Sequence, residues 1–380
     1  MGIKPEFETF AKEIQAELKQ LVCDLTVIPA PSGHEERRAE FIKNWMEQKG
    51  AKGVFIDEAL NVIWPYNDDG KCDLVVFMGH TDTVFPAETE LKIREEGDVL
   101  HCPGIGDDTA QLCVMLTTAA YFAKQNAKPK TGMLFVANSC EEGLGNLKGT
   151  RQLMKTYGDR VKQVISYDSS LGHIVERPVG SHRYKVNIKT EGGHSYIAFG
   201  NRNAIHIMSS LIESLYSVKV PKNGDSKTTY NVGHISGGTS VNTIAEECEM
   251  FYEYRSDDKE CLALMKDMFL KMIEAYKATG VSINVESLGE RPCMGDVDPE
   301  AHKALLQSVA ASFEKIGVKT LFKSASTDAN IPLSLGIPAV TIGVTIAPGA
   351  HTLGEKLYTS SMLNGMRFSL DFMAKYFENQ

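Results

Sequence analysis

The chain has 380 residues and a formal net charge of −9 at pH 7, because 49 Asp and Glu outnumber 40 Lys and Arg. Apolar residues make up 43% and charged residues 23% of the chain, an ordinary globular composition that excludes disordered, collagen-like and coiled-coil proteins. The length suggests two or three domains, and the acidic charge argues against general binding of nucleic-acid phosphates.

The first half of the chain alternates between helical and strand patterns. Helices are predicted at 7–28 and 35–49, separated by Pro29–Gly33, with Ser32 capping the second helix and Glu35 as its capping-box partner. Buried strands are predicted at 73–78, 131–138 and 161–167, with a helix at 108–124 between the first two. Strands that alternate with helices indicate an α/β sheet covered on both faces.

The pattern changes near residue 180, where strands begin to alternate polar and apolar residues. The segments that follow are 183–190, 203–217, 228–235, 245–255, 259–279 and 281–286. Their order, β-α-β-β-α-β, predicts a ferredoxin-like α+β unit with one open sheet face. After Pro292 the first pattern returns, with helices at 299–316 and 360–378 and strands at 319–323 and 338–343. We predict an α/β domain with a mixed sheet, residues 1–180 and 292–380, interrupted by an inserted domain at 181–291.

Location is indicated by what the sequence lacks. No apolar run approaches the roughly 20 residues that span a bilayer, and residues 1–20 lack the apolar core of a signal peptide. The eight cysteines form no C-x-x-C pair, which favours free thiols over a zinc–cysteine site. We therefore expect a cytoplasmic protein without membrane or nucleic-acid partners.

Polar side chains follow the first predicted strand. His80 and Asp82 come directly after it and lie two residues apart, so both side chains face the same way on an extended chain. One can bind a metal while the other orients it. The plainer alternative is a polar loop with a capping aspartate.

Two pairs of adjacent carboxylates follow along the chain. Asp107 and Asp108 stand at the start of a predicted helix, where aspartates are commonly caps. Glu141 and Glu142 follow the strand at 131–138. A metal can bind one of these glutamates while the other remains free as a general base, although a solvated acidic turn is the alternative.

Two single residues complete the set. Asp168 follows the strand at 161–167, and His351 lies in a Gly/Pro loop after the strand at 338–343. Alone, the first is an ordinary turn former and the second a surface group. Together, however, these motifs all follow strands of one domain, and open α/β sheets bind ligands at the carboxyl ends of their strands. Imidazoles and carboxylates without thiolate suit a dinuclear zinc centre, with cobalt or manganese as substitutes.

The motifs occur in the order Gly-His-x-Asp-x-Val, Gly-Asp-Asp, Glu-Glu-Gly, a strand-end Asp and Gly-Ala-His. In this order the sequence closely resembles the di-zinc exopeptidase and deacylase family of peptidase T, carboxypeptidase G and acetylornithine deacetylase. The resemblance covers nearly the whole chain. It implies two Zn²⁺ per chain, with His80 and Asp168 as ligands of one, Glu142 and His351 as ligands of the other, and Asp107 bridging both.

The resemblance also implies roles beyond the metal ligands. Glu141 should be the general base that takes a proton from the attacking water and passes it to the leaving amine, and Asp82 should hold His80. In the inserted domain, His194 resembles a residue that stabilises the oxyanion, often in the partner subunit's site, although a turn histidine is the alternative. Asn242 and Arg255 resemble substrate-binding positions, and Arg255 suits a substrate carboxylate.

Three further features follow from the comparison with this family. The inserted domain usually forms a dimer or a lid, so a homodimer through this domain is expected. Ser326-Thr327-Asp328 resembles a pocket loop near the last ligand. Thr109 departs from the pattern, because many relatives have a lysine near this position, but this change leaves the ligands unaffected.

The substrate is indicated by one residue. Family members with Asp at the position of Asp168 tend to be aminopeptidases, and those with Glu tend to be deacylases or carboxypeptidases. The resemblance therefore favours a metal-dependent aminopeptidase acting on short peptides. An N-acyl-amino-acid deacylase or carboxypeptidase-like hydrolase is the alternative, because Arg255 suits a free α-carboxylate. A catalytically inactive binding protein is disfavoured because Glu141 and all five ligands are present, and a phosphoesterase is disfavoured by the order of the motifs.

Overall fold

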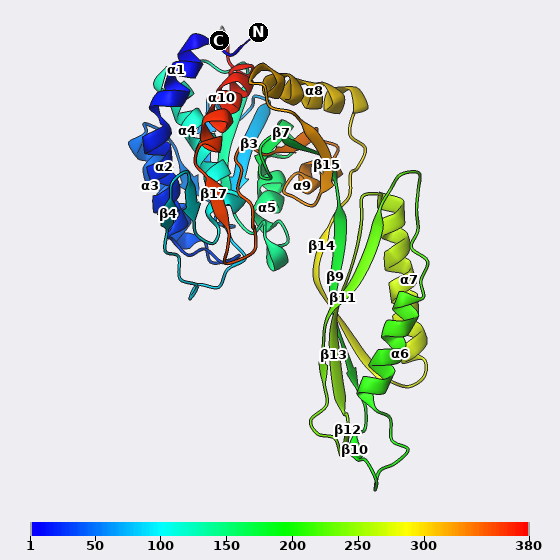
Figure 1. The fold of residues 1–380 in the computed structure, drawn as a ribbon. Coiled ribbons are helices and arrows are strands. Elements are labelled where there is room, and N and C mark those ends of the chain that lie inside the picture. The colour runs from blue at the N-terminus through cyan, green and yellow to red at the C-terminus, as the bar shows by residue number, and fades with distance from the viewer. Residues whose placement is uncertain (1, 379–380) are drawn as a thin grey trace. The chain divides into compact units, whose positions relative to one another are not determined.

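A computed structural model describes residues 2–378 and divides the chain into two compact units (Figure 1). The first unit runs to Pro178 and resumes at Gly295, and the second spans Val179–Met294. The predicted insertion at 181–291 falls within this second unit.

The first unit is a mixed eight-stranded sheet with helices. In sheet order the strands are β1 (Phe55–Ile56), β2 (Val62–Tyr66), β6 (Gly132–Asn138), β3 (Leu74–His80), β7 (Val161–Tyr167), β16 (Ala339–Ile342), β8 (His173–Pro178) and β15 (Leu321–Ala325). The helices are α1 (Pro5–Glu13), α2 (Gln15–Thr26), α3 (Glu36–Gln48), α4 (Gln111–Lys124), α5 (Lys148–Tyr157), α8 (Pro299–Lys315), α9 (Asn330–Ser334) and α10 (Ser361–Ala374).

The central strands are parallel. β3 pairs in parallel with both β6 and β7, and β16 pairs in parallel with β7, whereas β2 runs antiparallel to β6. β3 and β6 are buried along their whole length, as their continuous apolar sequences predict. The prediction of a mixed α/β sheet flanked by helices is therefore confirmed, and the carboxyl ends of β3, β6, β7 and β16 meet at one edge.

Aromatic side chains join the sheet to the helices on one face. Phe77 of β3 packs edge-on against Phe372 of α10, with ring centroids 6.4 Å apart. Phe368 of α10 stacks on Phe313 of α8 at 3.8 Å. Each such ring contributes about 1.5–3 kcal/mol when buried. This aromatic packing joins the sheet to α8 and α10 and restricts the movement of the strands. It thereby helps to set the positions of their carboxyl ends.

The capping box predicted for the second helix is wrong. The residue that precedes α3 is Glu35, and no side chain caps the helix. Ser32 instead donates its hydroxyl to Asp82 at 2.5 Å, and the Glu35 carboxylate accepts the N–H of Cys140 at 3.0 Å. Both side chains bond to groups distant in sequence, because buried polar groups there need partners. The predicted helix at 7–28 is also two helices, α1 and α2.

A small three-stranded sheet escaped the sequence analysis. Its strands, in order, are β17 (Lys356–Tyr358), β5 (Val99–His101) and β4 (Arg94–Glu96). The strands are short and partly charged, and β17 joins from more than 250 residues away. After β5, the chain continues through residues 102–104 to the η1 turn (Ile105–Ala110), in which the Asp107–Asp108 peptide bond is cis.

The second unit has the β-α-β-β-α-β order predicted from the sequence. Its elements are β9 (Gly180–Lys189), α6 (Ala204–Tyr216), β11 (Thr228–Gly237), β13 (Glu247–Ser256), α7 (Lys259–Lys277) and β14 (Ser282–Arg291). The antiparallel sheet has the order β11-β13-β9-β14, and α6 and α7 cover one face (Figure 1). β10 (Gly193–His194) and β12 (Thr243–Ile244) form a separate two-stranded antiparallel sheet.

One membrane-related expectation can be checked directly. Among residues 2–378, no helix has both the length and the apolar character needed to cross a bilayer.

A buried arginine ties three parts of the first unit together. Arg38 of α3 is only 1% exposed. Its guanidinium donates to the carbonyl oxygens of Ile28 at 2.8 Å, Thr81 at 2.9 Å and Thr26 at 3.3 Å, and to the Thr109 hydroxyl at 3.2 Å. Burial lowers the pKa of this guanidinium to about 10, so it stays charged at neutral pH. The end of α2, the loop after β3 and the η1 turn are thus joined by one side chain.

Arg38→Met should lower the free energy of unfolding by about 2–4 kcal/mol, because buried carbonyl groups lose their donors. Urea unfolding measures this change. Arg37→Met is the matched control, since Arg37 is the next residue back on the same helix and is exposed, and it should change stability by less than about 0.5 kcal/mol. Equal stabilities for the two variants would contradict this role of Arg38.

Candidate metal centre

The candidate site lies at the carboxyl edge of the large sheet. His80 is the last residue of β3, Glu141 and Glu142 follow the end of β6, and Asp168 comes directly after β7. These strands are parallel, so their ends bring the side chains to the same edge. Asp107 comes from the η1 turn, so the site draws on four separate segments even before the C-terminal loop is included.

The structure brings together all five side chains that the sequence singled out as metal ligands. Donor atoms of His80, Asp107 and Asp168 lie within 4.8 Å of one another, and so do those of Asp107, Glu142 and His351. Asp107 belongs to both groups. Its Oδ1 lies 3.1 Å from Nε2 of His80, and its Oδ2 lies 3.2 Å from Nε2 of His351. One carboxylate therefore faces both groups, as a bridging ligand must.

Glu141 lies beside the same groups. Its carboxylate falls within 4.8 Å of donor atoms of His80 and Glu142, and the residue is only 5% exposed. The residues His80, Glu141 and Glu142 thus form a third compact group at the site. Glu141 belongs to neither of the two groups that share Asp107.

Asp82 organises this side of the site. Its backbone oxygen lies 3.1 Å from Nδ1 of His80, and its carboxylate lies 3.4 Å from the same nitrogen. The carboxylate also accepts the N–H groups of Glu141 and Glu142, each at 2.9 Å, and the hydroxyl of Ser32. One buried aspartate therefore orients His80 and also fixes the turn that carries both glutamates.

The site is short of positive charge. Burial and the nearby charge of Asp107 raise the pKa of Asp168 well above its ordinary value, and burial raises that of Glu142 to about 7. Burial opposes protonation of His80, but its bonds to Asp107 and Asp82 raise its pKa well above 6.5. Bonds to Asp107 and Glu142 raise the pKa of His351 to about 10. Without a metal, protons must supply the missing positive charge.

The donor set fits a dinuclear divalent metal centre. Imidazole nitrogens and carboxylate oxygens without thiolate suit zinc, cobalt or manganese. Oδ1 of Asp108 is a buried acceptor without a hydrogen-bond partner among the described residues, and burial raises the pKa of this carboxyl group well above its ordinary value. Cations are therefore the natural complement of this cluster.

Several supporting residues were missed by sequence analysis. Ser32, Glu35 and Arg38 bond to the loops that carry the site, over separations of 43 to 110 residues. Asp328, which belongs to the expected pocket loop, is buried and accepts the side-chain N–H of Asn138 at 2.6 Å, at the end of β6. No local pattern could reveal these contacts, because each joins segments that are distant in sequence.

The second unit holds the three remaining candidates. The N–H of Ser195, next to His194, donates to the Asn242 carbonyl at 2.9 Å, so these two candidates lie close together. Arg255 forms two 3.0 Å bonds to Glu253 near the other end of β13. Eight residues of extended chain separate Arg255 from the start of that strand, or roughly 26 Å. His194 and Asn242 thus share one end of this unit and Arg255 the other.

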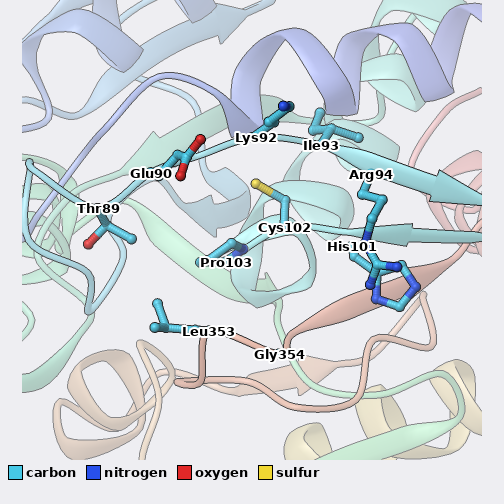
Figure 2. Close-up of a pocket in the computed structure, with 10 residues that line it drawn as sticks. All are labelled: Thr89, Glu90, Lys92, Ile93, Arg94, His101, Cys102, Pro103, Leu353 and Gly354. Atoms are coloured by element: carbon cyan, nitrogen blue, oxygen red, sulfur yellow. The ribbon is translucent and has the colours of Figure 1, made fainter.

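The loop that carries His351 borders open space. A cavity of about 800 Å³ is lined by Leu353 and Gly354 of this loop and by residues of the β4–β5 region (Figure 2). The His351 side chain is 55% exposed and Leu353 is 74% exposed. Apolar packing therefore does little to hold this loop, and hydrogen bonds must set its position.

Comparison with known proteins identifies the class. Residues 76–375 match Peptidase family M20/M25/M40, and the chain belongs to this family. The predicted resemblance is thereby confirmed, and the protein is a hydrolase that acts on amide bonds. Peptidases of this family bind a dinuclear metal centre.

Individual relatives extend over nearly the whole chain. A succinyl-diaminopimelate desuccinylase of Corynebacterium glutamicum is 24% identical over 338 residues, which are 87% of this chain and 89% of the relative. The crystal structure of aminopeptidase PepT from Bacillus cereus matches with a TM-score of 0.75 at 21% identity, over 95% of this chain and 98% of that one. A dinuclear metal-binding M20 peptidase of Bacillus subtilis matches at 0.66 and 17% identity, over 96% and 99%. These structures establish the shared fold.

Removal of divalent metal should destabilise the protein, because the buried carboxylates lose the cations that offset their repulsion. Metal at 100 times its Kd stabilises a folded protein by about 2.7 kcal/mol. Unfolding in urea with a chelator, and then with added zinc, measures the difference. Asp107→Asn removes the shared carboxylate and should respond much less to zinc. Identical transitions of the unmodified protein with and without metal would contradict the assignment.

Proposed function

We propose that this hydrolase is an aminopeptidase that removes the N-terminal residue of short peptides with a dinuclear zinc centre. The observation that carries the proposal is the Asp107 carboxylate shared by two ligand groups, one of which includes Asp168 rather than a glutamate. An aspartate at this position is typical of the aminopeptidases of the family. The fold shared with aminopeptidase PepT supports the same assignment.

The ligands follow from the two groups at the sheet edge. His80, Asp107 and Asp168 would hold one ion, and Asp107, Glu142 and His351 would hold the other. When bound, two such ions supply Lewis acidity, which lowers the pKa of water and polarises a carbonyl group. Zinc is the expected metal, and cobalt or manganese can replace it.

Glu141 is the proposed general base. It accepts a proton from the attacking water and passes the same proton to the nitrogen of the leaving amine. This transfer requires no second acid or base. The bond from its N–H to Asp82 fixes the backbone that presents this carboxylate. Asp82 thereby orients both the proposed base and the proposed ligand His80.

The inserted unit is proposed to bind and cover the substrate. His194 would stabilise the oxyanion, and Asn242 and Arg255 would contact the peptide. Because Arg255 lies at the other end of this unit from His194 and Asn242, we propose that it contacts a different part of the substrate. We also propose that two chains form a homodimer through this unit. We propose a cytoplasmic location, where short peptides are available.

A deacylase of N-acyl amino acids is the second candidate. The similarity to a desuccinylase over 87% of this chain favours it. Such an enzyme would use the same ligands and the same base, but it would hold the opposite end of its substrate. Arg255 would then bind the free α-carboxylate of the product amino acid.

Glu141→Gln should lower kcat by about 10²–10⁴-fold, because the amide cannot accept the proton. Metal content should stay near two ions per chain when measured by mass spectrometry of the native protein. Glu142→Gln is the matched comparison, since the neighbouring residue is a proposed ligand and its variant should lose metal as well as activity. Normal turnover by Glu141→Gln would remove its role as base.

The substrate is decided by a pair of tripeptides, one with a free and one with an acetylated N-terminus, incubated with the zinc-loaded protein. We expect only the peptide with the free N-terminus to lose its first residue. Mass spectrometry of the products measures this loss. Release of acetate, or of the C-terminal residue, would contradict the aminopeptidase and would favour the second candidate.

A further inference from the structure

A buried glutamate outside the predicted site holds the turn that carries Asp107. Glu355 is 1% exposed. Its Oε2 accepts the N–H of Gly104 at 2.7 Å, and its Oε1 accepts the N–H groups of Gly106 at 2.8 Å and Asp107 at 2.9 Å. Three backbone donors of one turn therefore converge on a single carboxylate that lies about 250 residues away in sequence.

The turn depends on this carboxylate. Besides these bonds, the Glu355 carbonyl accepts the N–H of Cys102 at 3.2 Å. Gly104 has φ +72°, which glycine adopts readily, and a Cβ on Gly106 would lie 2.0 Å from the Cβ of Ala347, so the turn requires glycine at both positions and is closely packed. Charge-assisted bonds from backbone N–H groups to a carboxylate are among the stronger hydrogen bonds in proteins. Loss of the carboxylate would leave these donors buried without partners.

The same loop also supplies a side chain to Asp107. His351 precedes Glu355 by four residues, and its Nε2 lies 3.2 Å from Oδ2 of Asp107 and 2.9 Å from Oε1 of Glu142. Asp107 is thus approached twice by one loop, at its backbone by Glu355 and at its carboxylate by His351. Because the middle of the loop is exposed at Leu353, Glu355 is its buried anchor.

We propose that Glu355 is a positioning residue for the metal centre. It fixes the backbone of Asp107 relative to the loop that carries His351. The Asp107 carboxylate and the His351 imidazole would then be placed to bind the same ion. Glu355 belongs to none of the candidate ligand groups, and its two oxygens already accept three backbone N–H groups. The inference rests on the proposed function only in taking Asp107 and His351 as ligands.

Glu355→Gln tests the proposal with little change in size. One amide oxygen can still accept two N–H groups, but the NH₂ group then faces a third N–H donor. Loss of a partner that orients metal ligands typically costs 10–100-fold in affinity. We expect zinc binding, measured by titration calorimetry of the metal-free protein, to weaken by at least about tenfold for one of two ions.

Asp98→Asn is the matched control. The Asp98 carboxylate also binds the C-terminal segment, accepting the N–H of Ser360 at 2.7 Å and the Thr359 hydroxyl at 2.6 Å, but it touches no proposed ligand. This variant makes the same change from carboxylate to amide. Its zinc affinity should stay within about twofold of the unmodified protein.

Glu355→Asp separates position from charge and serves if the glutamine variant does not fold cooperatively. It keeps the negative charge but draws the carboxylate back by one carbon–carbon bond, and we expect it to weaken zinc binding as well. Unchanged affinity in both variants would overturn the proposal. So would normal affinity in Glu355→Asp alone, because charge rather than position would then explain the effect.

Zinc binding by the unmodified protein distinguishes an error in the role of Glu355 from an error in the proposed metal centre. If it binds two zinc ions and the Glu355 variants bind them equally well, only the role of Glu355 is wrong. If the unmodified protein binds no zinc, the proposed metal centre itself is wrong.

Discussion

Repulsion between buried carboxylates is the constraint on which the first unit depends. The sheet edge gathers donor atoms of His80, Asp107 and Asp168 in one group and of Asp107, Glu142 and His351 in another, each within 4.8 Å, and burial weakens the solvation that would otherwise stabilise the carboxylate charges. Two histidines offset part of this charge, and both point at Asp107. Bound cations would offset the remaining negative charge, and the packed sheet that carries these side chains limits how far they can move apart.

Hydrogen bonds to buried charged groups fix the positions of the site's segments relative to one another. Asp82 joins the end of β3 to the turn after β6, and Arg38 joins α2, the loop after β3 and the η1 turn. Glu355 joins the η1 turn to the C-terminal loop. Each contact uses a full charge against several backbone groups, and such a group tolerates little displacement once it is buried. The positions of the candidate ligands therefore depend on residues that belong to none of the candidate ligand groups.

Much of the fold follows from local patterns. The apolar runs of β3, β6 and β7 have the length typical of buried strands and were predicted as such. The alternating polar and apolar residues of β13 indicate a sheet with one exposed face. Weaker patterns failed where tertiary contacts overruled them. Ser32 has the chemistry of a helix cap but bonds to Asp82 instead, and the short strand β17 pairs only because a distant hairpin is available. Local propensity cannot report such competition between partners.

The sequence by itself determined the class of protein through the order of its motifs, which resembles that of a known family, and it identified the candidate residues because ligand chemistry requires particular residue types near strand ends. His80, Asp107, Glu141, Glu142, Asp168 and His351 could all be named in this way. Only the tertiary structure showed that Arg38 and Glu355 bond to the segments that carry these residues and that Asp328 bonds to Asn138. The physical reason is that these bonds join segments separated by tens to hundreds of residues, and a buried charge selects its partners by proximity in space, which periodicity along the chain does not encode.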